Sequence, residues 1–296
     1  EKGNNKSYAN YLAPPHTFHN EKLGRGVTKS QIQSAKRFLK VAMTPAKEDP
    51  LLAFYVASVI RKGNWTLSGY RYGYGAKQHK FYRKQIEYFE KSLSMKFYWY
   101  RQLSAKILGN IYYYGLLKAY ANPYPYIVDI DYEKAAKYYG ICGETCTFNY
   151  ISSVLHTDPK KGWSLLAKIP GFPGPKLTNE NYKQFTNAET KYQYLWAINR
   201  FGMYGVKKNE KSARKFYSIL NKHEDGLPLY GIDLNTGMGL FSLFRIMKKD
   251  TVFTDGAAVQ SIPTTPEAEI EVLHMALAKK YAKAARELYL KYSKGI

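Results

Sequence analysis

Three short segments of the chain follow one pattern, and this repetition constrains the fold more than any other feature. The segments are DYEKAAKYY at 131–139, DPKKGWSLL at 158–166 and NEKSARKFY at 209–217. Each begins with Asp or Asn, whose side chain can accept hydrogen bonds from the free amides of a helix's first turn. Each has a small residue at its fifth position, where a neighbouring helix can come close, and a bulky apolar pair at its end. We expect each segment to start a helix that packs on another helix.

A second pattern lies before the first of these segments. The stretch AKILGNIYYYG at 105–115 has, at spacings of three, four and three, Ala105, Leu108, Tyr112 and Gly115. The stretch ARELYLKYSKG at 285–295 has the same spacings. Such spacing marks one face of a helix, and a closing glycine is a common helix end. The two patterns together predict units of helix, turn and helix.

In the stretch RFGMYGVKKNEKSARKFY at 200–217, two glycines are followed by two adjacent lysines, as in a phosphate-binding loop. Such loops need a fixed glycine spacing directly after a buried strand. The residues before Gly202 read KYQYLWAINRF, which is a helical pattern, and neither loop motif fits. Gly202 and Gly205 therefore predict a turn between two antiparallel helices, with the lysines facing solvent.

These patterns resemble the Sel-one-like repeat family, which is related to tetratricopeptide repeats. The resemblance is best over 105–139, where the matching positions are Leu108, Gly109, Tyr112, Gly115, Asp131, Lys134, Ala135 and Tyr139. That unit has an insertion, LLKAYANPYPYI, between its two helices. In the unit around 200–217 the matching positions are Gly205, Val206, Asn209, Ala213 and Tyr217. Arg200 stands where the family has tyrosine, and the units at 65–93 and 147–169 are degenerate.

The resemblance implies an all-α fold, a right-handed α-solenoid of antiparallel helix pairs built from degenerate Sel-one-like repeats. We expect residues 1–27 to be an irregular N-terminal segment and residues 28–296 to form a single helical-repeat solenoid. The proline- and glycine-rich stretch IPGFPGPKLT at 169–178 is the best candidate for a hinge within it.

The charge of the chain favours acidic partners. It has 45 Lys and Arg against 23 Asp and Glu, a net charge of +22. Nucleic acid, an anionic membrane surface and an acidic protein would all suit this surplus. The basic residues are spread along the chain, whereas nucleic-acid binding prefers a patch or a stripe, so nucleic acid is the least favoured of the three. No apolar run is long enough to predict a membrane-spanning helix, although contact with a membrane surface is compatible with the charge.

Motifs of catalysis, cofactor binding and metal binding are missing from the sequence. It has no H-E-x-x-H and no G-x-S-x-G motif, and no pair of carboxylates stands out as a general acid and base. His16 and His19 lie close in sequence, but a loop pair of this sort is far more often structural or incidental than metal-binding. We therefore expect a protein that is not an enzyme and that has no catalytic residues, no cofactor and no metal.

The two cysteines, Cys142 and Cys146, lie in the stretch ICGETC. They form either one small disulfide in an oxidising compartment or two free thiols near a helix end. The spacing permits the disulfide only if the helix before it has ended by Gly143, which frees the chain to turn.

Helical solenoids bind other proteins on the concave surface formed by the first helix of each pair. The resemblance implies such a role, and most sharply that of a bacterial envelope immunity protein, which binds and inhibits a toxic effector such as a phospholipase of type VI secretion. A generic adaptor or secreted virulence factor is the alternative within the family, and a nucleic-acid-binding repeat is a further one. The first reading implies a periplasmic or otherwise exported protein, with a cytoplasmic location as the alternative.

One protein partner with an acidic surface is expected. Tyr, Trp and Arg are the residue types most enriched at binding hot spots, so residues of these types outside the packing positions are the candidates. The candidate contact residues are Arg71, Tyr72, Tyr98, Trp99, Asn110, Tyr113, Tyr114 and Arg200. Because an unpaired charge is costly to bury, we expect Arg200 to face a cleft or to pair with an acid.

Overall fold

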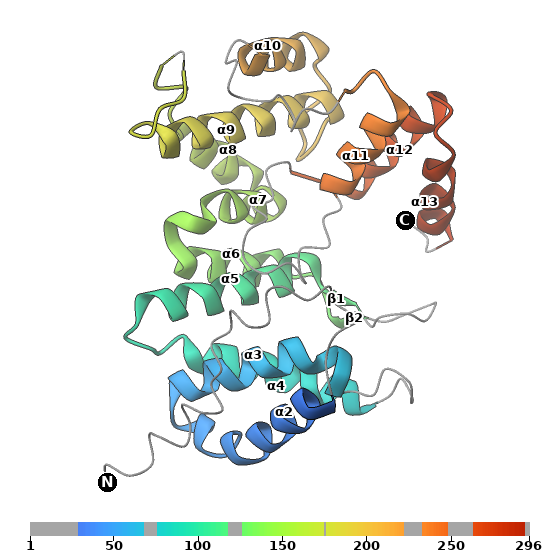
Figure 1. The fold of residues 1–296 in the computed structure, drawn as a ribbon. Helices are drawn as coiled ribbons and strands as arrows, with labels where there is room; N and C mark the ends of the chain where they lie inside the picture. Colours follow the sequence, from blue (N-terminus) through green and yellow to red (C-terminus); the bar gives the residue numbers. More distant parts are fainter. Residues whose placement is uncertain are drawn as a thin grey trace. The chain divides into compact units, whose positions relative to one another are not determined.

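The computed structural model describes residues 29–67, 76–117, 126–174, 176–221, 233–247 and 263–293. The regular secondary structure of these residues is helical apart from one short two-stranded ribbon (Figure 1), so the predicted all-α class is confirmed. The chain divides into two compact units, Glu1–Leu108 and Gly109–Ile296, with the division inside helix α5 (Tyr98–Tyr114). The predicted irregular segment 1–27 lies outside the described residues, and the predicted hinge at 169–178 lies within the second unit.

The first unit consists of four helical elements and the first part of α5. The elements are α2 (Lys29–Ala42), η2 (Pro45–Lys47), α3 (Pro50–Leu67) and α4 (Ala76–Ser92). Helix α3 packs on both α2 and α4. Asp49 starts α3, because its carboxylate accepts from the amides of Leu51 and Leu52. The ring of Phe54 lies 4.9 Å from that of Tyr100, which joins α3 to α5.

The second unit holds the rest of the chain from residue 109. Its elements are β1 (Leu116–Leu117), β2 (Tyr126–Val128), α6 (Tyr132–Cys142), η3 (Gly143–Cys146), α7 (Thr147–Thr157), α8 (Pro159–Lys168), α9 (Tyr182–Phe201), α10 (Glu210–Asn221), α11 (Gly237–Met247), α12 (Pro266–Ala278) and α13 (Ala282–Tyr292). Helices that follow one another in sequence pack together, as α6 does on α7, α9 on α10, and α11 on α12. Strands β1 and β2 pair antiparallel and join the two ends of the predicted insertion, a ribbon that the sequence did not predict.

The predicted helix starts are confirmed in all three repeated segments. Asp131 accepts from the amide of Lys134 at 2.9 Å, and Asp158 accepts from that of Lys161 at 3.0 Å. Asn209 accepts from the amide of Ser212 at 2.9 Å. These bonds satisfy amides that a helix leaves free at its N-terminus, so the boundaries of these helices follow from local sequence.

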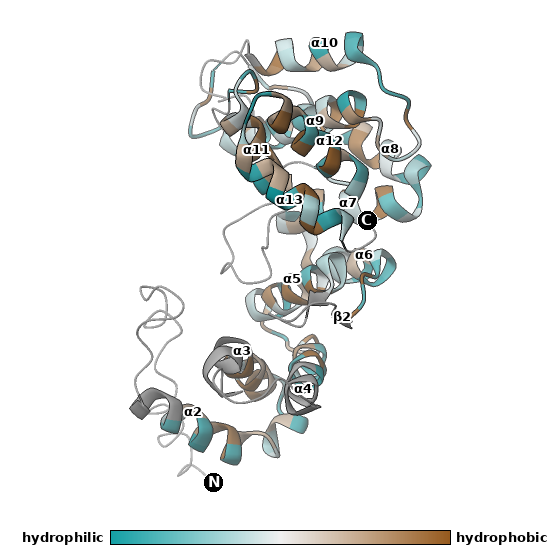
Figure 2. Ribbon diagram, turned by 90° about the vertical axis from the view of Figure 1, so that its right-hand side faces the viewer, coloured by the Kyte–Doolittle hydropathy of each residue, from teal (hydrophilic) through white to brown (hydrophobic). Residues whose placement is uncertain are grey.

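The small positions lie where helices meet. Ala135 is fully buried, and a Cβ at Gly109 would lie 2.6 Å from the Cδ1 atom of Tyr139. Helices α5 and α6 therefore approach so closely that the Tyr139 ring fills the place of a side chain at Gly109. The buried core of this unit continues through α7, α9, α11 and α12. Figure 2 shows helices such as α9 and α11 with both hydrophobic and hydrophilic residues, as amphipathic packing requires.

The glycines at 202 and 205 form the predicted turn between α9 and α10. Gly202 ends α9 in the left-handed conformation with φ of 70°, and Gly205 has φ of 76°. Tyr204 lies between them with φ of 55°, a conformation that bulky residues rarely adopt. This stretch is therefore a helix connection, as the sequence predicts, with one strained residue that the sequence does not reveal.

The two cysteines form a disulfide, which is the first of the two alternatives that the sequence left open. Their Cα atoms are 5.8 Å apart and both side chains are buried. Helix α6 ends at Cys142, and Gly143 turns the chain with φ of 75°, so the condition that the spacing set is met.

Within the described ranges, every helix is too short or too polar to cross a bilayer.

Candidate functional site

One cavity of the second unit lies beside Arg200, one of the candidate contact residues. It has a volume of about 580 Å³ and is formed by α9, α10, the turn before α11, α11 itself and one residue of α12. The lining residues are Trp196, Arg200, Phe201, Glu210, Ala213, Arg214, Tyr217, Ser218, Leu234, Asn235, Leu240, Leu243 and Met275. We call this cavity the Arg200 pocket.

The lining residues of α9 and α10 are spaced by three or four residues, so those of each helix lie on one face. Trp196 and Arg200 are four residues apart on α9, so they lie on one face, one turn from each other. On α10, Glu210, Ala213 and Tyr217 follow at spacings of three and four. The α10 residue nearest the core is Ala213, which is 1% exposed and leaves room between the helices. Ala213, the small residue of the segment 209–217, is thus part of the lining of the pocket.

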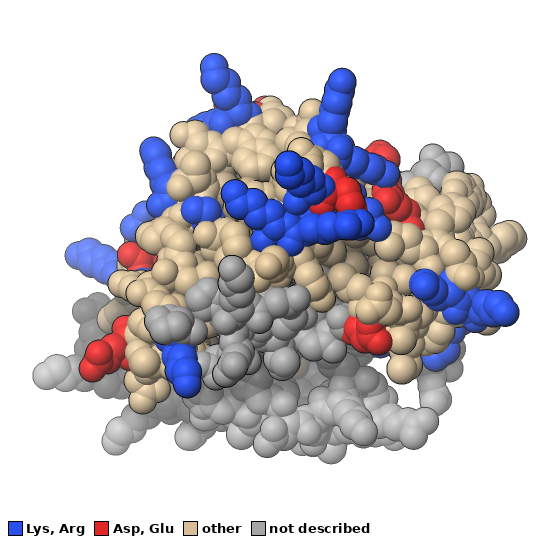
Figure 3. Space-filling model, turned by 90° about the horizontal axis from the view of Figure 1, so that it is seen from above, with Lys and Arg blue, Asp and Glu red and all other residues tan. Residues whose placement is uncertain are grey.

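Charged side chains lie at one side of the pocket and share one carboxylate. The Arg200 Nη1 atom lies 3.0 Å from one oxygen of Glu210, and the Arg214 Nε atom lies 3.3 Å from the other. Arg200 lines a cavity and pairs with an acid, as the cost of burying a lone charge predicts. Two guanidinium groups against one carboxylate leave a net positive charge. Figure 3 looks onto the end of the unit that carries α10, and basic side chains predominate over acidic ones there.

The floor of the pocket is apolar. Trp196, Leu240 and Leu243 are buried and belong to the hydrophobic core of the unit. A pocket with an apolar floor and a few convergent polar groups is the usual form of a binding site. A side chain or peptide end with apolar and anionic parts would match both features, because it could fill the floor and meet the arginines.

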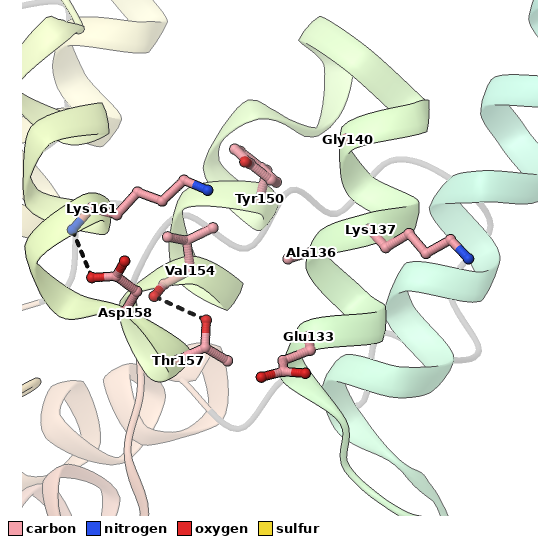
Figure 4. Close-up of a pocket in the computed structure, with 9 residues that line it drawn as sticks. All are labelled: Glu133, Ala136, Lys137, Gly140, Tyr150, Val154, Thr157, Asp158 and Lys161. Carbon is pink, nitrogen blue, oxygen red and sulfur yellow. Dashed lines mark hydrogen bonds between the residues drawn. The ribbon is translucent and has the colours of Figure 1, made fainter.

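A second cavity, of about 410 Å³, lies among α6, α7 and α8 (Figure 4). Its charged lining has both signs, with Glu133 and Asp158 against Lys137 and Lys161. Asp158 is already engaged in starting α8, because it accepts from the amide of Lys161. With mixed charge and without a predicted contact residue, this cavity carries less functional signal than the Arg200 pocket.

The candidates Tyr98 and Trp99 lie at the start of α5 in the first unit. They are 67% and 71% exposed, and the preceding Phe97 is 65% exposed. Three adjacent aromatic side chains in solvent are unusual on a protein surface, where contiguous apolar patches mark interaction sites. We call these three residues the aromatic turn. The other early candidates, Arg71 and Tyr72, lie outside the described residues.

The candidates on the second half of α5 take part in packing, and the prediction that Tyr113 contacts a partner is wrong. Tyr113 is 3% exposed, and its hydroxyl lies 2.6 Å from the Oγ atom of Ser152. Asn110 accepts a hydrogen bond of 2.7 Å from Tyr139. The half-buried ring of Tyr114 packs edge-on against Tyr113 at 4.8 Å. Both α6 and α7 contact this part of α5, so a wider arc of the helix is buried than a single packing face would explain.

A cluster around His156 was missed by sequence reasoning. The imidazole stacks on Tyr132 with centroids 3.8 Å apart, and Tyr113 and Tyr204 place their hydroxyls 3.4 and 3.5 Å from its Nε2 atom. Desolvation by burial lowers the pKa of His156 to about 4, although Glu267 opposes the shift. The imidazole is therefore neutral near pH 7 and can exchange hydrogen bonds with both phenols. The one local feature that marks this cluster is the positive φ of Tyr204, which the structure reveals but the sequence does not.

Among the residues that the structure describes, no group of three or more His, Cys, Asp and Glu side chains could hold a metal ion. Comparisons of the chain with protein-family models, with curated proteins and with solved structures found no match.

Proposed function

We propose that this chain is a non-enzymatic, protein-binding helical-repeat protein and that the Arg200 pocket anchors its partner. The observation that carries the proposal is the pocket itself, with an apolar floor and a cationic side built on two successive helices. Arginine, tryptophan and tyrosine, the types most enriched at hot spots, all line it.

The packing of the repeated positions supports the proposed repeat architecture. Leu108, Ala135 and Tyr139 are fully buried, as residues between stacked helices should be. Gly115 has φ of 66° at the end of α5, and Gly202 ends α9 in the same way. We propose on these grounds that the units are Sel-one-like helix pairs that stack as a right-handed α-solenoid.

The proposed partner presents an acidic group beside an apolar side chain. Within this proposal the sharper reading is an envelope immunity protein that occupies and inhibits a toxic effector, a reading that rests on the family resemblance. An adaptor or a secreted virulence factor would use the same pocket for another protein. Strong loss of binding at raised salt would instead favour nucleic acid, whose affinity comes from released counterions.

The test is binding of the protein encoded by the neighbouring gene, measured by titration calorimetry with wild type and two variants. Arg200→Glu places a carboxylate beside Glu210 and should weaken binding by more than about 1 kcal/mol. Lys215→Glu is the matched control, since it makes the same change of charge on an exposed residue of α10 outside the pocket.

The control should bind as wild type does. Both variants should keep the wild-type circular dichroism spectrum, because exposed ion pairs contribute little to stability. Equal affinity of Arg200→Glu and wild type would show that the pocket does not anchor this partner.

A further inference from the structure

The aromatic turn of the first unit is held rigidly from both sides. Met95 before it is 6% exposed, and Tyr100 after it packs on Phe54 in the core of the unit. Beneath the turn, the hydroxyl of Ser92 donates to that of Ser104 at 2.6 Å and ties α4 to α5. The exposed rings therefore project from a fixed support and are not the end of a loose segment.

The three rings surround the start of α5 instead of forming a stripe along it. Successive residues of a helix are turned by about 100°, so Tyr98 and Trp99 point in different directions, and Phe97 precedes them just outside the helix. Phe97, Tyr98 and Trp99 each keep about two thirds of their surface in solvent. A contact with a protein groove uses one face, at spacings of three and four residues. A deformable surface into which the start of α5 inserts would cover all three rings.

The surroundings of the aromatic turn are basic. Exposed Lys96 precedes it, and exposed Arg101 lies one helical turn after Phe97. Between Glu90 and Asp129 the sequence contains five basic residues and no acidic one. Lysine is depleted in protein interfaces, whereas aromatic rings next to Lys and Arg are typical of segments that bind at the lipid–water boundary.

From this geometry we infer that the aromatic turn docks the protein onto an anionic lipid surface. Phe97 and Trp99 enter the headgroup region, Tyr98 keeps its hydroxyl at the polar boundary, and Lys96 and Arg101 meet lipid phosphates. The surface lies in another unit than the Arg200 pocket and does not depend on the proposed protein partner.

The experiment is co-sedimentation of the full chain with vesicles of phosphatidylcholine, with or without phosphatidylglycerol. Wild type should bind the vesicles that contain phosphatidylglycerol, and salt of about 0.5 M should reduce the binding by screening. The triple variant Phe97→Ser, Tyr98→Ser, Trp99→Ser should partition about tenfold less or weaker still. The matched control is the double variant Tyr182→Ser, Tyr289→Ser, which removes rings that are 60% and 72% exposed elsewhere and should bind as wild type does.

Tryptophan emission gives a second readout that depends on insertion. The anionic vesicles should shift the emission of wild type to shorter wavelength, and Trp99→Phe should keep binding but lose that shift. Equal binding of wild type and the triple variant would overturn the inference, and so would equal binding to both kinds of vesicle. If no vesicle binds and the triple variant loses affinity for the protein partner, the aromatic turn is a protein contact and the inference is wrong. Arg200→Glu should bind vesicles normally, so the two proposals can fail separately.

Discussion

Gly109 lies within α5 and Gly140 in the last turn of α6, and the structure predicts that replacing them with alanine has opposite effects. Alanine is favoured over glycine in a helix by about 1 kcal/mol, so Gly→Ala ordinarily stabilises. At Gly140 a new Cβ would have its nearest neighbour in Tyr150, at 3.9 Å, which is an ordinary contact. Gly140→Ala should therefore raise the free energy of unfolding by about 0.5–1 kcal/mol.

At Gly109 the new methyl group would lie 2.6 Å from two ring atoms of Tyr139. That ring is fully buried, and its hydroxyl is bonded to Asn110 on the same helix as Gly109, so it cannot turn away cheaply. Overpacking of this kind costs about 1–3 kcal/mol. After the helical gain of about 1 kcal/mol is subtracted, Gly109→Ala should destabilise by up to about 2 kcal/mol.

The assay is urea unfolding of the oxidised protein, followed by circular dichroism, for wild type and the two alanine variants. The transition midpoint should fall for Gly109→Ala and rise for Gly140→Ala, with slopes equal to that of wild type. A Gly109→Ala protein that is stabilised as much as Gly140→Ala would refute the close approach of α5 and α6 and with it the repeat register.

Three further predictions concern the interior of the second unit. Tyr113→Phe should lower stability by about 1 kcal/mol in the same assay, because it leaves Ser152 without the phenol, and wild-type stability would contradict the burial of that hydroxyl. His156 takes up a proton at about pH 6.5 in the unfolded chain but only near pH 4 in the folded one. Stability should therefore be complete above pH 6.5 and fall by up to about 3 kcal/mol towards pH 4, and His156→Gln should lose most of this fall. Thiol labelling of denatured protein that has not been reduced should find no free Cys142 or Cys146, whereas two labelled thiols would refute the bond.

The features that the sequence predicted correctly are local ones. The side chain of an N-cap such as Asp131 bonds to a backbone amide only three residues further along the chain. A helix end such as Gly202 requires only a residue that tolerates positive φ. Each of these features is decided within a few residues, so pattern and residue type suffice.

The error at Tyr113 arose because a helical period shows where one packing face lies but not how many neighbours a helix has. Leu108 and Tyr112 were assigned to that face, and Tyr113 was left for solvent. In the structure α5 meets Tyr139 of α6 and Ser152 of α7, so a second face is buried as well. The cluster around His156 escaped prediction for a related reason, since Tyr204 is 48 residues away in sequence.

Arg200 shows how far sequence reasoning reaches towards a binding site. A charge at a packing position predicts a cleft or an acidic partner, and Glu210 lies only ten residues on, across the turn between α9 and α10. The floor of the pocket could not be predicted in this way, because Leu240, Leu243 and Met275 come from helices later in the chain. The arginines of the pocket thus come from α9 and α10, whereas much of its apolar floor comes from α11 and α12. Recognition of an acidic side chain of the partner should therefore depend on Arg200. Selection among apolar side chains of the partner should depend on how α11 packs.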